Sequence, residues 1–467
     1  MTGLLIRGAE VAGCAGVDVR VRGERVSEVA PGLHRAAGES VLEARGGALL
    51  PGLHDAHLHL AALAAAGTSV RCGPPDVRDA GELAAALGAG AADAHGWVRG
   101  VGYVETVAGE LDSAAVDRWH ASRPVRIQHR SGALWIVNSA AAQHLGLADG
   151  VHPGIERAAD GTPTGRLWRA DDWLRSRLPP PPAPDLAAVG AHLAALGITA
   201  VTDATPDLDD DALAFLGHAV DRGDIPQRVQ LLGVPLDRRE PGPRLAVGPY
   251  KIVLADSGLP DLDSLVGRIR TVHAVGRSVA VHCVSREALV LLVAGLRSSG
   301  ARRGDRIEHA SLVPAELLRE LAVSGLRVVT QPGFLADRGD DYLADVPAPD
   351  HGDLYRCRSL LDAGIPVALS SDAPYGPLDP WAVVAAAMHR RTPTGAVAGT
   401  AERVSFDEAL GAYLSAHGDP GGEPRRVVPG LAADLVLLDR PLADMAAEPA
   451  AGAVRTVLIG GSVVTDR

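Results

Sequence analysis

The sequence has few aromatic residues, few cysteines, and fewer basic than acidic residues. Aromatic side chains make up only 3% of the 467 residues, so the core must be built from leucine, valine, alanine and isoleucine. The four cysteines stand far apart and form no CxxC pair, which argues against a disulfide framework and favours a reducing compartment. The formal charge of −12, from 57 acidic and 45 basic residues, argues against nucleic-acid or anionic-membrane partners.

The sequence also lacks the features of a secreted or membrane-spanning chain. Residues 1–13 show no basic start followed by an apolar run, so no signal peptide is evident. No uncharged stretch reaches the roughly 18–20 apolar residues that a membrane helix needs. We therefore expect a cytoplasmic protein with no nucleic-acid or membrane partner. A homodimer is compatible with the sequence.

The two ends of the chain resemble each other in pattern. Residues 1–49 contain short alternating apolar runs separated by glycine-rich turns, and residues 427–467 contain similar runs in ADLVLLD and AVRTVLIGGSVV. Such alternation is typical of half-buried strands. We expect the two ends to pair into one small composite β-domain, a β-sandwich.

The middle of the chain, residues 50–426, alternates apolar runs with helical stretches rich in alanine and leucine. This alternation is typical of β/α units with a parallel sheet. Eight such units favour a closed (β/α)8 barrel of the TIM type over an open sheet. The expected strands are 53–59, 198–203, 228–233, 249–254, 278–282, 306–309, 326–331 and 366–371.

Residues 61–197 are too long for a simple connection between the first two expected strands. They contain strand-like and helix-like runs of their own, such as WVRGVGY and PVRIQHR. The proline-rich stretch PPPPAP at 179–184 is typical of a stiff linker. We expect an inserted subdomain that covers the top of the barrel as a lid.

Polar residues stand at the ends of five of the expected strands. In a (β/α)8 barrel the active site lies at the carboxyl ends of the strands, so these side chains should share one rim. Taken singly, a strand histidine is commonly a hydrogen-bonded core residue, an aspartate can form a turn, and a lysine can reach solvent. Taken together, histidines and a carboxylate on one rim match a site for a divalent metal. The set is His57, His59, Lys251, His282, His309 and Asp372.

The stretch PGLHDAHLH resembles the PGxxDxHxH signature of the amidohydrolase superfamily. The other rim residues follow that family's order of lysine, histidine, histidine and aspartate. The stretches LAALGITAVTDAT, GDRIEHASLVP, SLLDAGIPVALSSDAPYGPLDP and VVPGLAADLVLLD are most similar to the branch that contains N-substituted formamide deformylases. The resemblance covers nearly the whole chain.

The resemblance implies roles for the rim residues. His57 and His59 would bind a first metal, His282 and His309 a second, and Lys251 would bridge both ions as its CO2-derived carbamate. Asp372 would bind the first metal and act as the general base, and Asp55 would orient a histidine ring or the neighbouring backbone. In the alternative with one ion, His57, His59, His282 and Asp372 would hold it, and His309 would orient substrate or water. Zinc is the expected ion, although iron and manganese also suit such ligands.

The implied reaction is hydrolysis of an amide, formamide or cyclic amide C–N bond of a small-molecule substrate by metal-activated water. Deamination or another ring-directed hydrolysis would use the same site, and an inactive binding barrel is a further alternative. The family branch usually has a Gly-His pair in the insertion, but this chain has Ala133 at the histidine position, so the branch's substrate cannot be assumed.

Further residues are candidates for contact with substrate, and others are expected to face away from the site. The weaker candidates are His129, Arg130, Trp135, Gln331 and Tyr375. Strand alternation predicts that His54, Cys283 and Glu308 point away from the metal-binding face.

Overall fold

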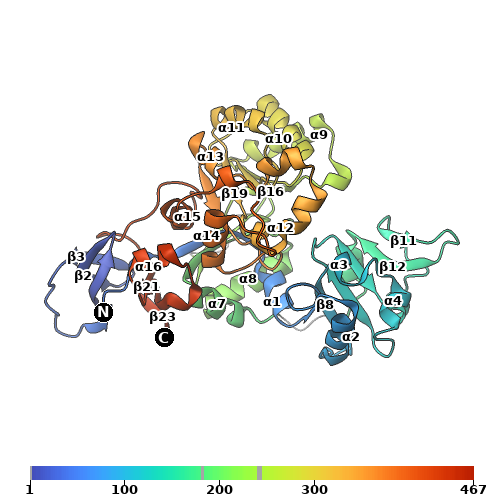
Figure 1. Ribbon diagram of the computed structural model, residues 1–467, viewed down its shortest axis with the longest axis horizontal. Helices are drawn as coiled ribbons and strands as arrows, with labels where there is room; N and C mark the ends of the chain where they lie inside the picture. The colour runs from blue at the N-terminus through green and yellow to red at the C-terminus, as the bar shows by residue number, and fades with distance from the viewer. Residues whose placement is uncertain (1–2, 180–183, 239–243) are drawn as a thin grey trace. The chain divides into compact units, whose positions relative to one another are not determined.

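The computed structural model describes residues 3–179, 184–238 and 244–467. Contacts within the chain divide it into two compact units (Figure 1): the first joins Met1–Leu60 to Leu186–Arg467, and the second is Ala61–Asp185. Apart from its two end residues, the linker predicted over 179–184 lies outside the described residues. The predicted domain boundaries, and the role of residues 61–197 as a lid, stay predictions.

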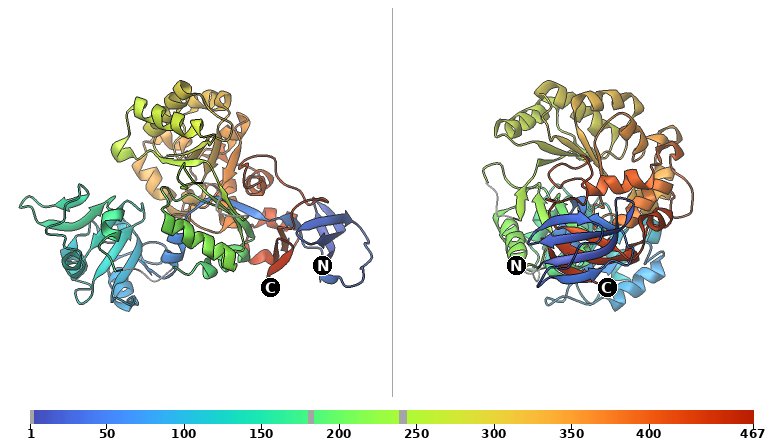
Figure 2. Two further views of the ribbon diagram at one scale, coloured as in Figure 1. Left: turned by 180° about the vertical axis from the view of Figure 1, so that it is seen from behind. Right: turned by 90° about the vertical axis from the view of Figure 1, so that its left-hand side faces the viewer.

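The first unit has two four-stranded sheets, one of N-terminal strands and one that joins the N-terminal strand β5 to three C-terminal strands. One has the order β3-β2-β1-β4, and the other has the order β23-β22-β21-β5. Apolar side chains from both sheets form one core cluster, in which Ile6, Val19, Leu435 and Leu458 are fully buried. The right-hand view of Figure 2 shows the blue and red strands of these sheets against each other. The strands are β1 (Leu4–Val11), β2 (Cys14–Arg22), β3 (Arg25–Ala30), β4 (Ser40–Glu43), β5 (Leu49–Pro51), β21 (Leu435–Leu438), β22 (Val454–Ile459) and β23 (Ser462–Asp466).

Two parallel sheets form the centre of the first unit, with orders β15-β14-β13-β6 and β16-β17-β18-β19-β20. A strand lies at each of the eight predicted positions with ends shifted by at most two residues, and β15 is an addition. Most of their residues are buried because helices and neighbouring strands cover both faces, as is usual for parallel sheets. The strands are β6 (Leu53–Leu58), β13 (Ile198–Asp203), β14 (Arg228–Leu231), β15 (Leu245–Val247), β16 (Tyr250–Val253), β17 (Val279–Cys283), β18 (Arg306–His309), β19 (Arg327–Thr330) and β20 (Val367–Leu369).

Helices alternate with these strands, which confirms the predicted α/β class. Several start at a side chain that accepts a hydrogen bond from the first turn, as Asp209, Asp261 and Ser285 do for α8, α9 and α10. The helices after the second unit are α7 (Leu186–Ala195), α8 (Asp210–Arg222), α9 (Leu262–Ala274), α10 (Arg286–Ser299), α11 (Leu318–Ser324), α12 (Gly333–Asp345), α13 (Arg358–Asp362), α14 (Pro380–His389), α15 (Phe406–Leu414) and α16 (Leu442–Ala447). Short 3-10 helices are η1 (Asp256–Gly258), η2 (Ala315–Leu317), η3 (Ala348–Asp353), η4 (Thr400–Glu402) and η5 (Ala451–Ala453).

Backbone hydrogen bonds join the two parallel sheets at two places. The amide of Lys251 in β16 donates to the carbonyl of Leu232, which follows β14, at 3.1 Å. At the second place, the amide of Asp372 donates to the carbonyl of His57 at 2.8 Å, and that of His59 to the carbonyl of Ala373 at 2.9 Å. Residues near the ends of β6 and β20 are thereby held side by side.

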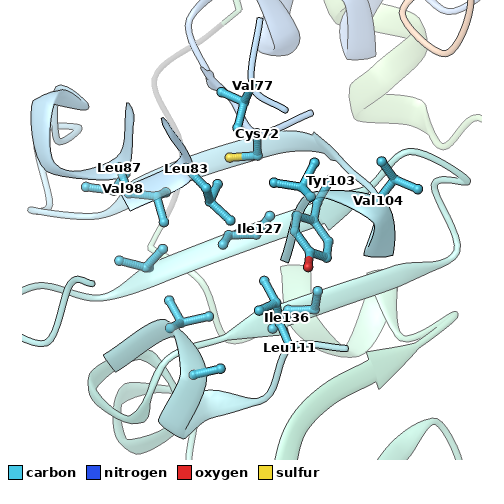
Figure 3. Packing of buried hydrophobic residues seen from close by; sticks show 14 of the residues in the cluster. Cys72, Val77, Leu83, Leu87, Val98, Tyr103, Val104, Leu111, Ile127 and Ile136 are labelled. Atoms are coloured by element: carbon cyan, nitrogen blue, oxygen red, sulfur yellow. The ribbon is translucent and has the colours of Figure 1, made fainter. Parts of the chain in front are cut away.

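The second unit has a six-stranded sheet of its own, in the order β11-β12-β10-β9-β8-β7. One buried cluster includes Cys72, Leu83, Tyr103 and Ile127 (Figure 3), and another includes Trp135. Its strands are β7 (Val70–Arg71), β8 (Val98–Tyr103), β9 (Val125–His129), β10 (Leu134–Val137), β11 (Ile155–Arg157) and β12 (Pro163–Trp168). Its helices are α2 (Ala80–Ala89), α3 (Glu105–Ala108), α4 (Ser113–Asp117), α5 (Ser139–His144) and α6 (Asp171–Arg175), and α1 (Leu60–Gly67) begins at its boundary.

All four cysteines are free, as their spacing predicts, and three of them are buried. Among the residues that the structure describes, no helix combines the length and the apolar character needed to cross a lipid bilayer.

Candidate metal centre

Two histidines lie at the carboxyl end of β6. His57 belongs to the strand and His59 directly follows it. Side chains two positions apart in a strand point to the same face, and here the two ring centroids are 5.5 Å apart. The strand therefore places both imidazoles on one face at its carboxyl end.

Asp372 brings a carboxylate to these two rings from the loop after β20. Its Oδ1 lies 3.2 Å from His59 Nε2 and 3.5 Å from His57 Nε2. Within the described part of the chain, these three side chains form a group whose ligand atoms all lie within 4.8 Å of one another. The structure thus brings together three of the residues that the sequence selected.

The backbone is strained at two of the site residues, His309 at the end of β18 and Asp372 just after β20. Asp372 has φ 55° and His309 has φ 72°, both in the left-handed region that residues other than glycine seldom adopt. Such a conformation costs on the order of 1–3 kcal/mol and is found mainly at functional sites. At both strand ends this left-handed conformation changes the direction of the chain, and so it also changes the direction of the His309 and Asp372 side chains.

Each ring in the group has a hydrogen-bond partner on its Nδ1. His57 Nδ1 pairs with Glu308 Oε2, and His59 Nδ1 lies 3.1 Å from Thr205 Oγ1. With Nδ1 occupied, both rings turn Nε2 toward Asp372. A histidine held through one ring nitrogen is oriented to bind a metal with the other.

His309 extends the group toward His282. The ring of His309 lies 4.7 Å from that of His57 and 4.4 Å from that of His282, measured between centroids. His309 Nδ1 lies 3.0 Å from Gln331 Oε1, and Gln331 Nε2 donates to Ser370 Oγ at 2.9 Å. His282 and His309 therefore adjoin the compact group of three, although they are not part of it.

Lys251 is buried on the same side of the sheet, with 3% of its surface exposed. It lies two residues before Val253, which is opposite His282 in the parallel register, so Lys251, Val253 and His282 share a face. Burial lowers the pKa of the Lys251 ammonium group from its ordinary value. The lysine thus lies on the same face of the sheet as His282.

The group of three has the chemistry of a divalent-metal site. His57 Nε2 and Asp372 Oδ1 are buried atoms without a hydrogen-bond partner, which is costly unless something else satisfies them. Burial also holds the pKa of His57 and of His309 well below the ordinary value, and so favours the neutral imidazole that binds metals. Neutral imidazoles beside a carboxylate fit zinc and similar ions.

Asp55 acts on the backbone around the site. Its Oδ1 accepts from the amide of His57 at 3.1 Å and from the amide of Ser371 at 3.2 Å. It thereby ties the end of β6 to the chain after β20, next to Asp372. Burial raises the pKa of Asp55 to about 7.

The weaker substrate candidates fall into two groups. In the first unit, the Tyr375 ring lies 5.5 Å from that of His59, and Gln331 is the partner of His309 described above. In the second unit, His129 pairs with Ser131 and Glu105, and Arg130 is the next residue. Trp135 is 5% exposed and its indole N–H donates to Asp171, so its ring packs in the core of that unit.

The prediction from strand alternation that Glu308 points away from the site is wrong. In the parallel register Glu308 lies opposite His282, so the two side chains share a face. His309, the next residue, reaches the same site because its backbone is left-handed. A sequence-based assignment of the register between β17 and β18 could have revealed Glu308. For Cys283 the structure agrees with the expectation, because its buried thiol donates to the Ala288 carbonyl.

The comparisons with known proteins agree on one family. The model of the amidohydrolase family matches residues 40–465. The N-substituted formamide deformylase of Arthrobacter pascens is 27% identical, over 95% of this chain and 91% of the deformylase. Two crystal structures of uncharacterized metal-dependent hydrolases share the fold. The one from Pyrococcus horikoshii OT3 has a TM-score of 0.75 at 19% identity, covering 94% of this chain and 98% of that one. The one from Pyrococcus furiosus has a TM-score of 0.71 at 21% identity, covering 94% and 99%.

A family match of this length confirms the resemblance inferred from the motifs. It also confirms the predicted class of enzyme, a hydrolase of C–N bonds other than peptide bonds. The chain therefore belongs to the amidohydrolase family.

Proposed function

We propose that the protein is a metal-dependent hydrolase that cleaves the C–N bond of an amide, formamide or cyclic amide, with Asp372 as the general base. The observation that carries the proposal is the convergence of His57, His59 and Asp372, whose ligand atoms lie within 4.8 Å of one another. Two of these atoms, His57 Nε2 and Asp372 Oδ1, are buried without a partner. A bound cation would satisfy both.

The proposed ligands divide between two ions. His57, His59 and Asp372 would hold the first, and His282 and His309 the second. Lys251 would bridge them as a carbamate, which forms from the neutral amine and CO2, and the burial that lowers its pKa favours the neutral amine. In the one-ion alternative Lys251 stays an amine and His309 orients substrate or water. The ring separation of 4.4 Å between His282 and His309 supports a second site next to the first.

We also propose that the two parallel sheets close into the predicted barrel. Two sets of backbone hydrogen bonds between the sheets support closure: one from Lys251 to Leu232, and one between the ends of β6 and β20. In a barrel the carboxyl ends of parallel strands meet at one rim, where active sites of this architecture lie.

The chemistry follows from the side chains around the rim. A bound divalent cation supplies an activated water near neutral pH and polarises the substrate carbonyl. Asp372 accepts the proton of the attacking water and delivers it to the leaving nitrogen, which needs a carboxylate within hydrogen-bond reach of both. In the one-ion alternative His309, whose Nδ1 lies 3.8 Å from Asp372 Oδ2, would orient substrate or water beside that carboxylate.

Likeness to a protein named as an N-substituted formamide deformylase favours an N-substituted formamide as the substrate. Ala133, which lies between β9 and β10, offers no imidazole where that branch has one, so substrate contacts there differ. A deaminase acting on a ring would use the same metal site.

The proposal is tested by elemental analysis together with a substrate panel. Protein purified without added metal should contain one or two equivalents of zinc, iron or manganese. A panel of N-formyl, N-acyl and cyclic-amide compounds, with amino-substituted heterocycles beside them, separates amide hydrolysis from deamination. Metal-free protein with full activity on any of these compounds would contradict the metal-dependent mechanism.

A further inference from the structure

A buried ion pair contacts the Nδ1 side of the His57 ring. Arg306 and Glu308 are both in β18 and are 1% and 0% exposed. Glu308 accepts from Arg306 Nε with one oxygen and from His57 Nδ1 with the other, so both carboxylate oxygens are engaged. Arg306 Nη2 also donates to the carbonyl of Ala56 at 3.3 Å. The pair therefore holds both the backbone before His57 and the ring itself.

We propose that Glu308, supported by Arg306, is a positioning residue that fixes the tautomer and orientation of His57 for metal binding. An ionised carboxylate can only accept, so the ring proton lies on Nδ1 and the lone pair on Nε2. That Nε2 is the buried atom without a partner, 3.5 Å from Asp372 Oδ1. The inference rests on the proposed metal-dependent function.

The groups that contact Nδ1 of His57, His59 and His309 differ in charge. His59 lies against the Thr205 hydroxyl and His309 against the Gln331 amide, which are neutral groups. Glu308 carries a full negative charge, which increases the basicity of the ring that it contacts. Loss of that charge should therefore weaken metal binding at His57.

A purely structural role for the ion pair is the competing explanation. Removing two charges from water is costly, and apolar side chains of similar volume often stabilise a core equally well. The pair is also placed so that one carboxylate oxygen is committed to His57, which a role in packing alone does not require. The two explanations differ in whether metal affinity changes when the charge is removed.

The test compares Glu308→Gln with wild type for the affinity of zinc alone, measured by chelator competition. The amide keeps the size of the side chain and removes its charge, and zinc affinity should fall about 10- to 100-fold. Glu402→Gln is the matched control, because Glu402 is also buried and accepts from Arg356 and from the backbone of Cys357 and Ser359. The control should lower the melting temperature and leave zinc affinity unchanged.

The outcomes separate this inference from the proposed function. Wild-type protein that binds no metal would refute the proposed function itself. Wild-type protein that binds zinc no more tightly than Glu308→Gln would refute the positioning role alone. Should Glu308→Gln fail to fold, 15N-histidine NMR of zinc-loaded wild type decides, with the His57 signals assigned by their loss in His57→Asn. A proton on Nδ1 with zinc on Nε2 supports the role, and zinc on Nδ1 overturns it.

Discussion

Replacing Asp372 by asparagine tests the proposed general base most directly. The change keeps the shape of the side chain and removes its charge and its capacity to take a proton. In the structure the carboxylate lies 3.2 Å from His59 Nε2 and 3.5 Å from His57 Nε2. Those two histidines remain in the variant, and the amide oxygen can still coordinate, so the variant should keep its metal.

The expected loss follows from the role of the carboxylate. General acid–base catalysis by a positioned side chain contributes about 10²- to 10⁴-fold to the rate. At about 1.4 kcal/mol for each factor of ten, the barrier should rise by roughly 3 to 5 kcal/mol. We therefore expect kcat to fall at least a hundredfold on the best substrate of the panel, with metal content and melting temperature close to wild type.

The assay measures kcat and the metal content of the same preparation. Asp209→Asn is a suitable control, because Asp209 caps α8 through its side chain and asparagine caps helices equally well. It should leave both quantities unchanged. An Asp372→Asn protein that keeps its metal and turns over within tenfold of wild type would remove Asp372 from the mechanism.

Three further predictions concern the metal site and its surroundings. Lys251→Ala should lose one metal equivalent by elemental analysis, because the truncated side chain can form no carbamate; an unchanged metal count favours the one-ion arrangement. Chelation should abolish turnover and lower the melting temperature. Zinc at a hundred times its dissociation constant should restore about 2.7 kcal/mol of unfolding free energy. An unchanged melting temperature after chelation would contradict a resident ion. Burial raises the pKa of Asp55 from 3.8 to about 7, so the folded metal-free protein holds a proton that the unfolded chain releases. Between about pH 4 and pH 7 its unfolding free energy should fall relative to Asp55→Asn by up to about 4 kcal/mol in urea titrations, and parallel pH curves would contradict this.

Local sequence patterns were sufficient to locate the strands and much of the site. The apolar runs that predict β6, β13 and the other parallel strands are short, buried and separated by helical stretches, so each can be recognised without its neighbours. His57 and His59 share a face by strand alternation alone. Asp372 could be selected because residues directly after a parallel strand lie at the same edge of the sheet as other strand ends.

The partners of the histidines could not be predicted in the same way. The contact between His57 and Glu308 depends on how strands far apart in the sequence are aligned, and alternation within one strand says nothing about that alignment. His309 and Asp372 have a left-handed backbone, so strand alternation does not predict the direction of their side chains. The contacts of Thr205 and Gln331 with their histidines likewise depend on tertiary packing.

The shared core of the two terminal sheets constrains how the chain can fold. Ile6 and Val19 share one buried cluster with Leu435 and Leu458, so the strands before Pro51 lack part of their core until the strands from β21 onward are available. Bringing together the two ends of so long a segment costs conformational entropy, which is offset only when the interface between the two sheets has formed. During synthesis the early strands would expose unpaired apolar faces for as long as the intervening units take to emerge, a state in which chaperone binding or aggregation competes with folding.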